Sequence, residues 1–441
     1  MRAFISDRLG NRWPIFYGWW IVAAALVGSA VISGVSFWTF TVYIPPLEEE
    51  FGWSRAEVSA AFSLSLLVGG LAGPFAGLTV DRYGARSSIA IACVLTAGSL
   101  VLLSQIQNLW QFYSVYMLHA LVRTWMFFIP IQWLLTRWFV RRRGMALGLS
   151  TAGLGVGGAV FLPLVNFFIE TWGWRASFEI SAVIIAVTFI PMALLVLRDN
   201  PQEMGLVPDG VEGRAPTRVA PAFYGPRRDW SLGDVVRSSA FWLLAGAFTL
   251  FFMAQTSILV HIVPYLKDAG ISSGAAAALV SLSAIVRTVV RVAIGMAVDR
   301  IADLRRVAIL VVLAQAAGVL LLSLSAHPLA LVLFAVTWGA GGGAAPVLEI
   351  MLLSRTFGLR NFGLILGTLM LVETAGDISG PVIGGAIFDA TGGYMEAFLL
   401  YVAIYLVSCV GFYFSSRGAR RDAAAQEVPP TISVSPDHHT G

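Results

Sequence analysis

The chain has 441 residues, of which 57% are hydrophobic and only 12% are charged, and its mean hydropathy is +0.78. Soluble domains carry about 25% charged residues, so this composition excludes a soluble globular protein and a disordered one. The net charge is +4, and both cysteines, Cys93 and Cys409, lie in apolar stretches, which excludes a disulfide scaffold. Nucleic-acid binding is not expected, because the arginines are dispersed among short loops.

Twelve apolar stretches are long enough to be membrane-spanning helices, which need about 20 residues to cross a hydrocarbon core of roughly 30 Å. The stretches are continuous rather than alternating, so we expect an all-α membrane protein and no outer-membrane barrel. The first stretch has no cleavage site after it and is expected to remain as a helix. The predicted spans are 17–45, 56–80, 88–105, 109–136, 145–170, 176–197, 240–266, 274–298, 307–325, 328–353, 362–388 and 394–414.

The arginines predict the orientation of these spans. Most of them fall in the loops that share a side with the N-terminus, whereas Arg55, Arg175 and Lys267 fall on the other side. The positive-inside rule therefore predicts a multi-pass protein of a bacterial inner (plasma) membrane with both termini in the cytoplasm. Residues 198–239 read as a cytoplasmic linker and residues 415–441 as a polar, disordered tail.

The two halves of the chain repeat one pattern. Gly77-Leu-Thr-Val-Asp81-Arg82 follows the second span, and Gly295-Met-Ala-Val-Asp299-Arg300 follows the eighth. The repeat predicts two pseudo-symmetric six-helix bundles, residues 1–197 and 240–414, in a parallel relation. Repeats of this kind place a substrate site between the halves, near the middle of the membrane.

These loop motifs, together with six plus six spans, resemble the major facilitator superfamily. Within it the chain resembles the monocarboxylate transporters and the oxalate/formate antiporters. The resemblance implies secondary transport of a small organic anion by alternating access, with a monomer as the functional unit and no cofactor. It is carried by Tyr17-Gly-Trp-Trp-Ile-Val, Glu50-Phe-Gly-Trp-Ser-Arg-Ala-Glu-Val-Ser59, Arg141-Arg-Arg-Gly-Met-Ala-Leu-Gly148 and Gly173-Trp-Arg-Ala-Ser-Phe178.

Ionisable side chains within the spans are the candidate functional residues, because a charge at membrane depth is costly and usually faces the protein interior. Arg287 and Arg291 are four residues apart and share one face of their helix, as do two acids further along the chain. Guanidinium groups pair well with carboxylates, so we expect an anionic substrate, and the alternative is a structural ion pair with those acids. The candidates are His119, Arg123, His261, Arg287, Arg291, Glu349, Glu373 and Asp377.

The family resemblance assigns roles to some of these residues. Arg291 matches the substrate-binding arginine of the eighth helix, and His261 matches a histidine that lines the pocket in bacterial members. The first helix lacks the family's proton-linked lysine, and Arg287 replaces a family aspartate. Glu373 and Asp377 are therefore the expected proton-coupling groups, while His119 and Arg123 are expected either to complete the substrate site or, for His119, to pack.

Other charged residues have structural interpretations. Cytoplasmic latches that hold the outward-open state are expected from Asp81, Arg82, Arg86, Asp299 and Arg300. Glu349 is expected to pair with loop arginines near the end of its helix. The glycines of the fifth and eleventh spans are expected to allow close helix contact.

The sequence thus predicts a proton-coupled monocarboxylate symporter whose partners are a small organic anion, protons and the lipid bilayer. A proton-independent anion exchanger and a drug exporter are the alternative transport functions, and a non-transporting membrane sensor is the alternative of another class. No enzymatic constellation and no metal-ligand set is recognisable in the sequence.

Overall fold

The computed structural model describes residues 16–126, 128–210, 230–324 and 327–426, and every regular element in them is a helix. The first half contains α2 (Gly18–Ser33), a π-helical turn (Gly34–Trp38), α3 (Phe40–Phe51), α4 (Arg55–Tyr83), α5 (Ala85–Ser104), α6 (Leu109–Arg123), α7 (Phe128–Trp138) and α8 (Arg143–Pro191). The second half contains α10 (Ser239–Asp268), α11 (Ser273–Val298), α12 (Leu304–Leu324), α13 (Pro328–Phe357), α14 (Phe362–Thr391) and α15 (Met395–Gln426). Between them lie two short turns, Pro201–Met204 and Pro208–Gly210, and α9 (Leu232–Arg237).

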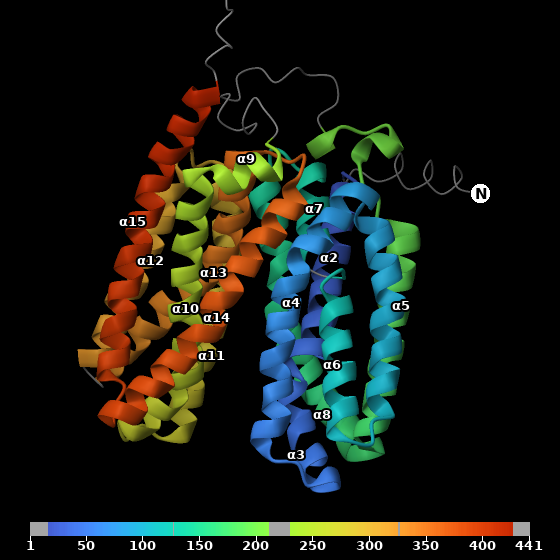
Figure 1. Ribbon diagram of the computed structural model, residues 1–441, viewed down its shortest axis with the longest axis vertical. Helices are drawn as coiled ribbons and strands as arrows, with labels where there is room; N and C mark the ends of the chain where they lie inside the picture. Colours follow the sequence, from blue (N-terminus) through green and yellow to red (C-terminus); the bar gives the residue numbers. More distant parts are fainter. Residues whose placement is uncertain (1–15, 127, 211–229, 325–326, 427–441) are drawn as a thin grey trace, which may run out of the picture.

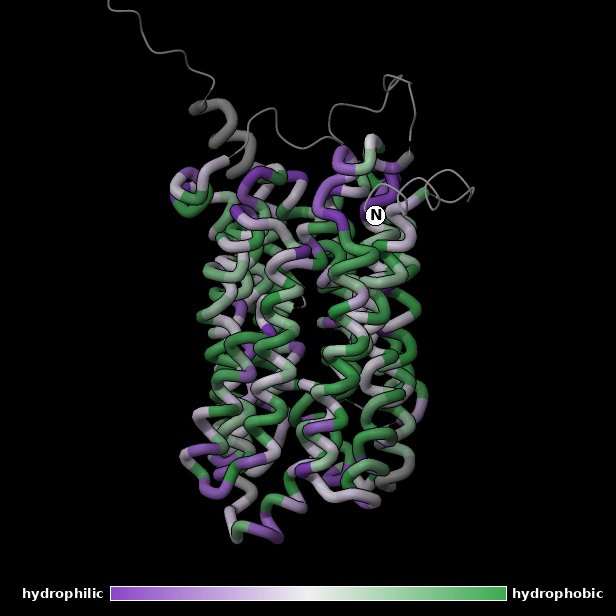
Figure 2. The backbone as a smooth tube through the Cα atoms, turned by 90° about the vertical axis from the view of Figure 1, so that its right-hand side faces the viewer, coloured by the Kyte–Doolittle hydropathy of each residue, from purple (hydrophilic) through white to green (hydrophobic). Residues whose placement is uncertain are grey.

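The helices cross a membrane twelve times. Eleven stretches of the described chain are long and apolar enough to span, and one of them, Arg143–Val196, has 54 residues and can span twice. At Gly173 the backbone turns with φ +82°, a conformation that glycine adopts at little cost. The fifth and sixth predicted spans are therefore joined by a glycine turn rather than by a loop. Figure 2 shows hydrophobic residues along the bundle and hydrophilic residues gathered at its two ends.

The fourth predicted span, 109–136, agrees with the apolar stretch Leu109–Trp138, which contains two helices, α6 and α7. Pro130, near the start of α7, has no N–H group to donate within a helix. One predicted boundary was wrong. Helix α15 continues to Gln426, so the first part of the tail that was expected to be disordered from residue 415 is helical. Its alanines and arginines are good helix formers. The remainder of the tail, and residues 211–229 of the linker, lie outside the described residues.

The two six-helix halves lie side by side (Figure 1). They approach each other at the end of the molecule that carries α9 and the linker turns, here called the linker end, and they diverge toward the end that carries α3. The contact is made by α4 against α14 and by α8 against α11. The same two pairs of helices are related by the internal repeat.

Glycines permit this close approach. A methyl group on Gly73 would lie 2.8 Å from the carbonyl oxygen of Gly367, and one on Gly144 would lie 2.6 Å from that of Gly295. Likewise, a methyl group on Gly148 would lie 2.7 Å from the carbonyl oxygen of Arg291. Backbone therefore meets backbone across the halves, as in small-residue helix contacts within membranes.

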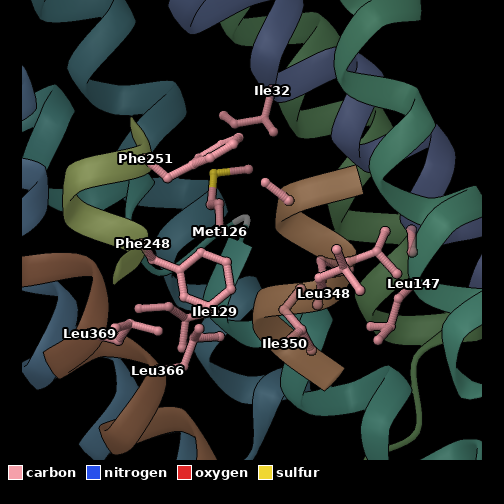
Figure 3. Packing of buried hydrophobic residues seen from close by; sticks show 14 of the residues in the cluster. Ile32, Met126, Ile129, Leu147, Phe248, Phe251, Leu348, Ile350, Leu366 and Leu369 are labelled. Carbon is pink, nitrogen blue, oxygen red and sulfur yellow. The ribbon is translucent and has the colours of Figure 1, made fainter. Parts of the chain in front are cut away.

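Apolar side chains extend this contact toward the middle of the molecule. Met126 and Ile129 belong to the first half and are fully buried. Figure 3 shows them among Phe248 and Leu366 of the second half, in agreement with the contact between α7 and α14. The linker end is thus closed by backbone contacts and by an apolar layer.

Candidate functional site

Arg291 lies where the two halves meet. Its side chain is 6% exposed, with Nη1 donating to the carbonyl of Thr151 in α8 at 2.8 Å. Its Nη2 donates to the carbonyl of Gly342 in α13 at 3.4 Å. The Nε atom is buried and has no partner among the described residues. Arg291 therefore bridges the halves in this state while its Nε atom has no acceptor among the described residues.

Arg287 lies one turn earlier on α11 and reaches the same glycine. A methyl group on Gly342 would lie 2.9 Å from Nε of Arg287. The guanidinium carbon stands 4.9 Å from the ring centre of Trp338, a distance at which a cation is attracted to an aromatic face. The side chain is partly exposed. The two arginines thus meet at Gly342, and Arg287 is the more accessible one.

No acid pairs with either arginine in the described part of the chain, where the ion pairs join Arg175 to Glu50 at 2.6 Å and Arg306 to Asp303 at 2.9 Å. The alternative prediction of a structural ion pair between α11 and the acids of α14 is therefore wrong for this state. A buried cation, Arg291, beside a partly exposed one, Arg287, is costly without a fixed counter-ion. Such an arrangement is compatible with an anion that binds reversibly.

The acids form a separate group. Glu373 of α14 is 6% exposed and Glu349 of α13 is 3% exposed, and an Oε1 atom of each has no hydrogen-bond partner in the residues described. Asp377 accepts a hydrogen bond from the Thr256 hydroxyl at 2.6 Å, and its charge and that of Glu349 are the electrostatic neighbours of Glu373. The predicted pairing of Glu349 with loop arginines was wrong, because this residue lies two turns inside its helix among other acids.

His261 is placed away from the arginines. Its Nε2 lies 3.0 Å from the carbonyl oxygen of Pro381, and its ring packs 5.2 Å from that of Tyr394. His261 lies two turns before the end of α10 that is far from the linker, whereas Arg291 lies two turns before the linker end of α11. The structure therefore does not bring them together in this state.

His119 and Arg123 lie within the first half. His119 is buried and shares a hydrogen bond of 2.9 Å with the Ser99 hydroxyl, and it lines a small cavity of about 20 Å³ beside Tyr116. Arg123 ends α6 and is an electrostatic neighbour of His119 and Tyr116. These residues form a group separate from the one at Gly342.

Two aspartates of the repeated motif bind across the halves. Asp81 of the first half accepts hydrogen bonds from the backbone N–H groups of Gly363, at 3.2 Å, and Leu364, at 2.8 Å. Asp299 of the second half accepts from those of Gly144, at 2.7 Å, and Met145, at 3.2 Å. Each carboxylate thus lies at the N-terminus of a helix in the opposite half, where unpaired N–H groups and the helix dipole favour a negative charge.

The arginines of the predicted latch do not take part in these contacts. Arg86 donates to the carbonyls of Ala193, at 2.8 Å, and Leu194, at 3.0 Å, within its own half. Arg82 and Arg300 are exposed, and within the described chain no hydrogen bond or ion pair joins either of them to the opposite half. In this state the predicted latch therefore does not include these three arginines.

Burial of Asp299 predicts that its contact across the halves depends on pH. Asp299 follows the last spanning residue of α11, and burial raises the pKa of its carboxyl above the usual value, against the opposing effects of the N–H donors, Arg355 and Arg143. Asp209 of the linker is the other charged group facing this cluster. Because the closed state has the raised pKa and the water-exposed open state has the ordinary one, the closed state binds the proton more tightly. Acidification on the linker side is therefore expected to favour closure.

This prediction is measured by maleimide labelling of a single cysteine introduced at Thr288, whose hydroxyl would lie 2.9 Å from a methyl group on Gly155 across the interface. Because the thiolate is the reacting species, the labelling rate at each pH is divided by that of a free thiol such as glutathione. This ratio should fall as the pH falls, and Asp299→Asn should remove most of that remaining dependence. An equal pH dependence in Asp299→Asn would contradict the assignment to Asp299.

Gln255 is a site residue that the sequence analysis missed. It comes from α10, is 5% exposed, and its Nε2 would lie 2.6 Å from a methyl group on Gly342. Its Oε1 accepts from Gln315 Nε2 at 2.7 Å. A search for uncharged amides inside the spans, and not only for charges, finds both glutamines, because amides at membrane depth also need partners.

The arrangement can be compared with known proteins. The profile of the Major Facilitator Superfamily matches residues 26–312 and 257–436. The chain is 26% identical over 398 residues to the oxalate:formate antiporter of Oxalobacter formigenes, covering 89% of this chain and 88% of that protein. It is also 26% identical over 393 residues to monocarboxylate transporter 13 of Bos taurus, covering 88% and 87%.

Solved structures show the same fold. The fucose:proton symporter of E. coli superposes with a TM-score of 0.66 at 14% identity, over 90% of this chain and 99% of that one. The human organic anion transporter MFSD10 superposes with a TM-score of 0.69 at 11% identity, over 90% and 99%. With the fold, the repeat and the sequence matches in agreement, this membrane transporter, which is not an enzyme, belongs to the major facilitator superfamily, in the branch of the monocarboxylate transporters and the oxalate:formate antiporter.

Proposed function

We propose that the chain carries small organic anions by alternating access and, in the simplest form, moves a monocarboxylate together with a proton. The observation that supports this most is the pair Arg287 and Arg291, which meet at Gly342 without an acidic partner among the described residues. A guanidinium can hold a carboxylate by two parallel hydrogen bonds. The substrate anion supplies the negative charge that balances the two arginines, for which the described residues provide no acid.

The proton is assigned to Glu373 and Asp377. Both lie on one face of α14, and Asp377 bonds Thr256, the neighbour of Gln255 in α10. A carboxyl group in this position is expected to be either protonated or paired with a cation, because an isolated charge in the membrane interior is costly. A proton taken up with the substrate keeps the net charge of the moving site constant, and this favours symport.

The linker end is assigned to the cytoplasm, following the distribution of arginines. With the backbone contacts, the apolar layer and the Asp81 and Asp299 bonds in place at that end, the state described here is outward-facing. Substrate binding must stabilise the occluded state relative to both open states, because a ligand shifts a conformational equilibrium only through differential affinity.

Proteoliposomes test this function. Uptake of labelled pyruvate or lactate should rise when the interior is made alkaline, because the proton gradient then drives symport. Glu373→Gln is expected to keep exchange of internal for external substrate but to lose acceleration by the gradient. Glu170→Gln, at an exposed surface position, is the matched control. Gradient-driven uptake that is unchanged in Glu373→Gln would refute the assignment of the proton to this residue.

Anion exchange without protons is the second candidate, and the same arginine pair favours it. An empty site with two cations and no counter-ion passes through the occluded state only at high cost. An exchanger avoids this cost, because it changes back to the outward-facing state only with a second anion bound. Uptake would then depend on preloaded counter-anion and would be indifferent to the pH gradient.

A further inference from the structure

A carboxylate of the linker binds the turn that joins α7 to α8. Asp209 accepts hydrogen bonds from three consecutive backbone N–H groups, those of Val140 at 3.1 Å, of Arg141, and of Arg142 at 3.1 Å. Its own backbone has φ +60°, and in the described chain no other residue except glycine has a positive φ. Such a conformation is strained for most residues and persists where contacts fix it. The three bonds thus fix this part of the linker on the first half.

The same stretch of chain receives Asp299 from the opposite half. The N–H groups of Gly144 and Met145, which Asp299 binds, begin two residues after the last one that Asp209 binds. Arg143 lies between the two sets of donors, is buried, and has both carboxylates as electrostatic neighbours. The linker and the opposite half therefore bind neighbouring parts of one turn and of the helix that it begins.

The linker segment before Asp209 is attached to the first half as well. Asp199 accepts from the backbone N–H of Arg86 at 2.9 Å, and Asn200 accepts from Arg137 Nη1 at 3.1 Å. These bonds do not cross the interface between the halves, because both donors belong to the first half. The bonds of the linker are therefore expected to persist when the halves separate, whereas those of Asp299 have to break.

Order in this turn affects closure through conformational entropy. A free turn loses backbone freedom each time it binds Asp299, and this loss opposes closure. A binding surface that is ordered beforehand avoids the loss. Arg143 contributes to the order by donating from Nε to the carbonyl of Phe139 at 2.9 Å, and Asp209 contributes through three backbone donors. A carboxylate on the linker can thus stabilise the closed state through the turn that it orders.

We propose that Asp209 is a positioning residue for the closed state. By binding the N–H groups of residues 140–142, it holds the start of α8 in the arrangement that Asp299 requires. The linker is then more than a connection between the bundles, because its first part prepares one side of the contact that closes the linker end. This inference concerns closure and does not depend on which solute is carried or on whether a proton moves with it.

A double-mutant cycle tests this role. It is read out by maleimide labelling of Thr288→Cys from the linker side, with each rate divided by that of glutathione. Asp209→Gly removes the carboxylate and suits a positive φ. We expect it to speed labelling at least about threefold, a size typical of coupling within one network of hydrogen bonds. Asp209→Asn keeps one acceptor oxygen and should change the rate in the same direction, but by less.

The second arm of the cycle removes Asp299. In Asp299→Ala the ordered turn has no carboxylate to bind, so the addition of Asp209→Gly should change labelling by less than about twofold. The Asp81 contact and the apolar layer remain in this background, so the linker end still closes and a further increase in rate is measurable. A residue that only supports the fold of the first half would give additive effects instead.

Val207→Gly is the matched control. Val207 is an exposed residue of the same linker segment, and its replacement adds backbone freedom while leaving Asp209 in place, so labelling should be unchanged. Two results would overturn the proposal: labelling at the normal rate in both Asp209→Gly and Asp209→Asn, or an equal acceleration by Asp209→Gly with and without Asp299. Size-exclusion profiles and unfolding temperatures show whether each variant is folded, and Asp209→Asn carries the test if Asp209→Gly is not.

Discussion

Replacement of Arg291 by glutamine is expected to lower uptake of a labelled carboxylic acid on the order of a hundredfold. Glutamine keeps an N–H donor but has no charge for the substrate, and it is too short to replace both bonds that Arg291 makes to the carbonyls of Thr151 and Gly342 in this state. Hydrogen bonds to charged groups contribute about 1.5–3 kcal/mol, and each 1.4 kcal/mol is about a factor of ten. Initial rates of uptake into proteoliposomes measure the loss.

Arg175→Gln is the matched control for this experiment. Arg175 is exposed and pairs with Glu50 at 2.6 Å, and an exposed ion pair contributes about 0–1 kcal/mol. Uptake by the Arg175→Gln variant should remain near that of the unmodified protein. Arg291→Lys, which restores the charge without the planar fork, should recover only part of the activity. Uptake within twofold of normal in Arg291→Gln would exclude a substrate role for this arginine.

The second large effect is expected from Gly148→Ala, which should trap the transporter with its linker end open. The added methyl group would lie 2.7 Å from the carbonyl oxygen of Arg291 and 3.2 Å from the Cα atom of Gly295. Both contacts are with backbone of the opposite half, so neither half can yield without separating. Transport should fall to background, while each half still folds.

Maleimide labelling of a cysteine at Thr288 measures this trapping, because that position faces Gly155 across the closed interface. Labelling from the linker side should be at least about tenfold faster in Gly148→Ala than in the unmodified protein. A tenfold change corresponds to destabilisation of the closed state, relative to the open state, on the order of 1.4 kcal/mol. Gly98→Ala on α5, where a methyl group meets nothing within 4 Å, is the control. Normal transport and normal labelling in Gly148→Ala would show that the halves do not close through this contact.

Hydropathy and the repeat predicted the spans and the two six-helix halves, but not which helices join the halves. The length of a span is set by the thickness of the bilayer, so the number of spans follows from the hydropathy along the chain. The motif ending in Asp81 and its counterpart ending in Asp299 predicted a contact that the hydrogen bonds now describe. The arginines next to these aspartates do not make the predicted contacts. An arginine side chain is three bonds longer than an aspartate side chain, so its partner depends on the packing around it and not on the motif alone.

The candidate site was predicted in part. Helical spacing placed Arg287 and Arg291 on one face, as observed, but it gave no information about Gly342, which lies two helices away along the chain. The depth of His261 could have been read from its distance to the end of α10, yet resemblance alone grouped it with Arg291. Gln255 was not predicted, because the candidates were chosen by charge and its side chain is an uncharged amide. Only the structure shows that its Nε2 atom is buried without an acceptor in the described chain.

Equilibrium binding to the purified protein tests most directly whether an organic anion binds at Gly342 beside the two arginines. Isothermal titration with pyruvate, oxalate and an organic cation such as tetraphenylphosphonium should give saturable binding for the acids alone, and that binding should disappear when Arg287 and Arg291 are both replaced by glutamine. Saturable binding of the cation that no acid displaces would contradict it, and would assign the buried acids Glu349, Glu373 and Asp377 to the export of a cationic drug instead.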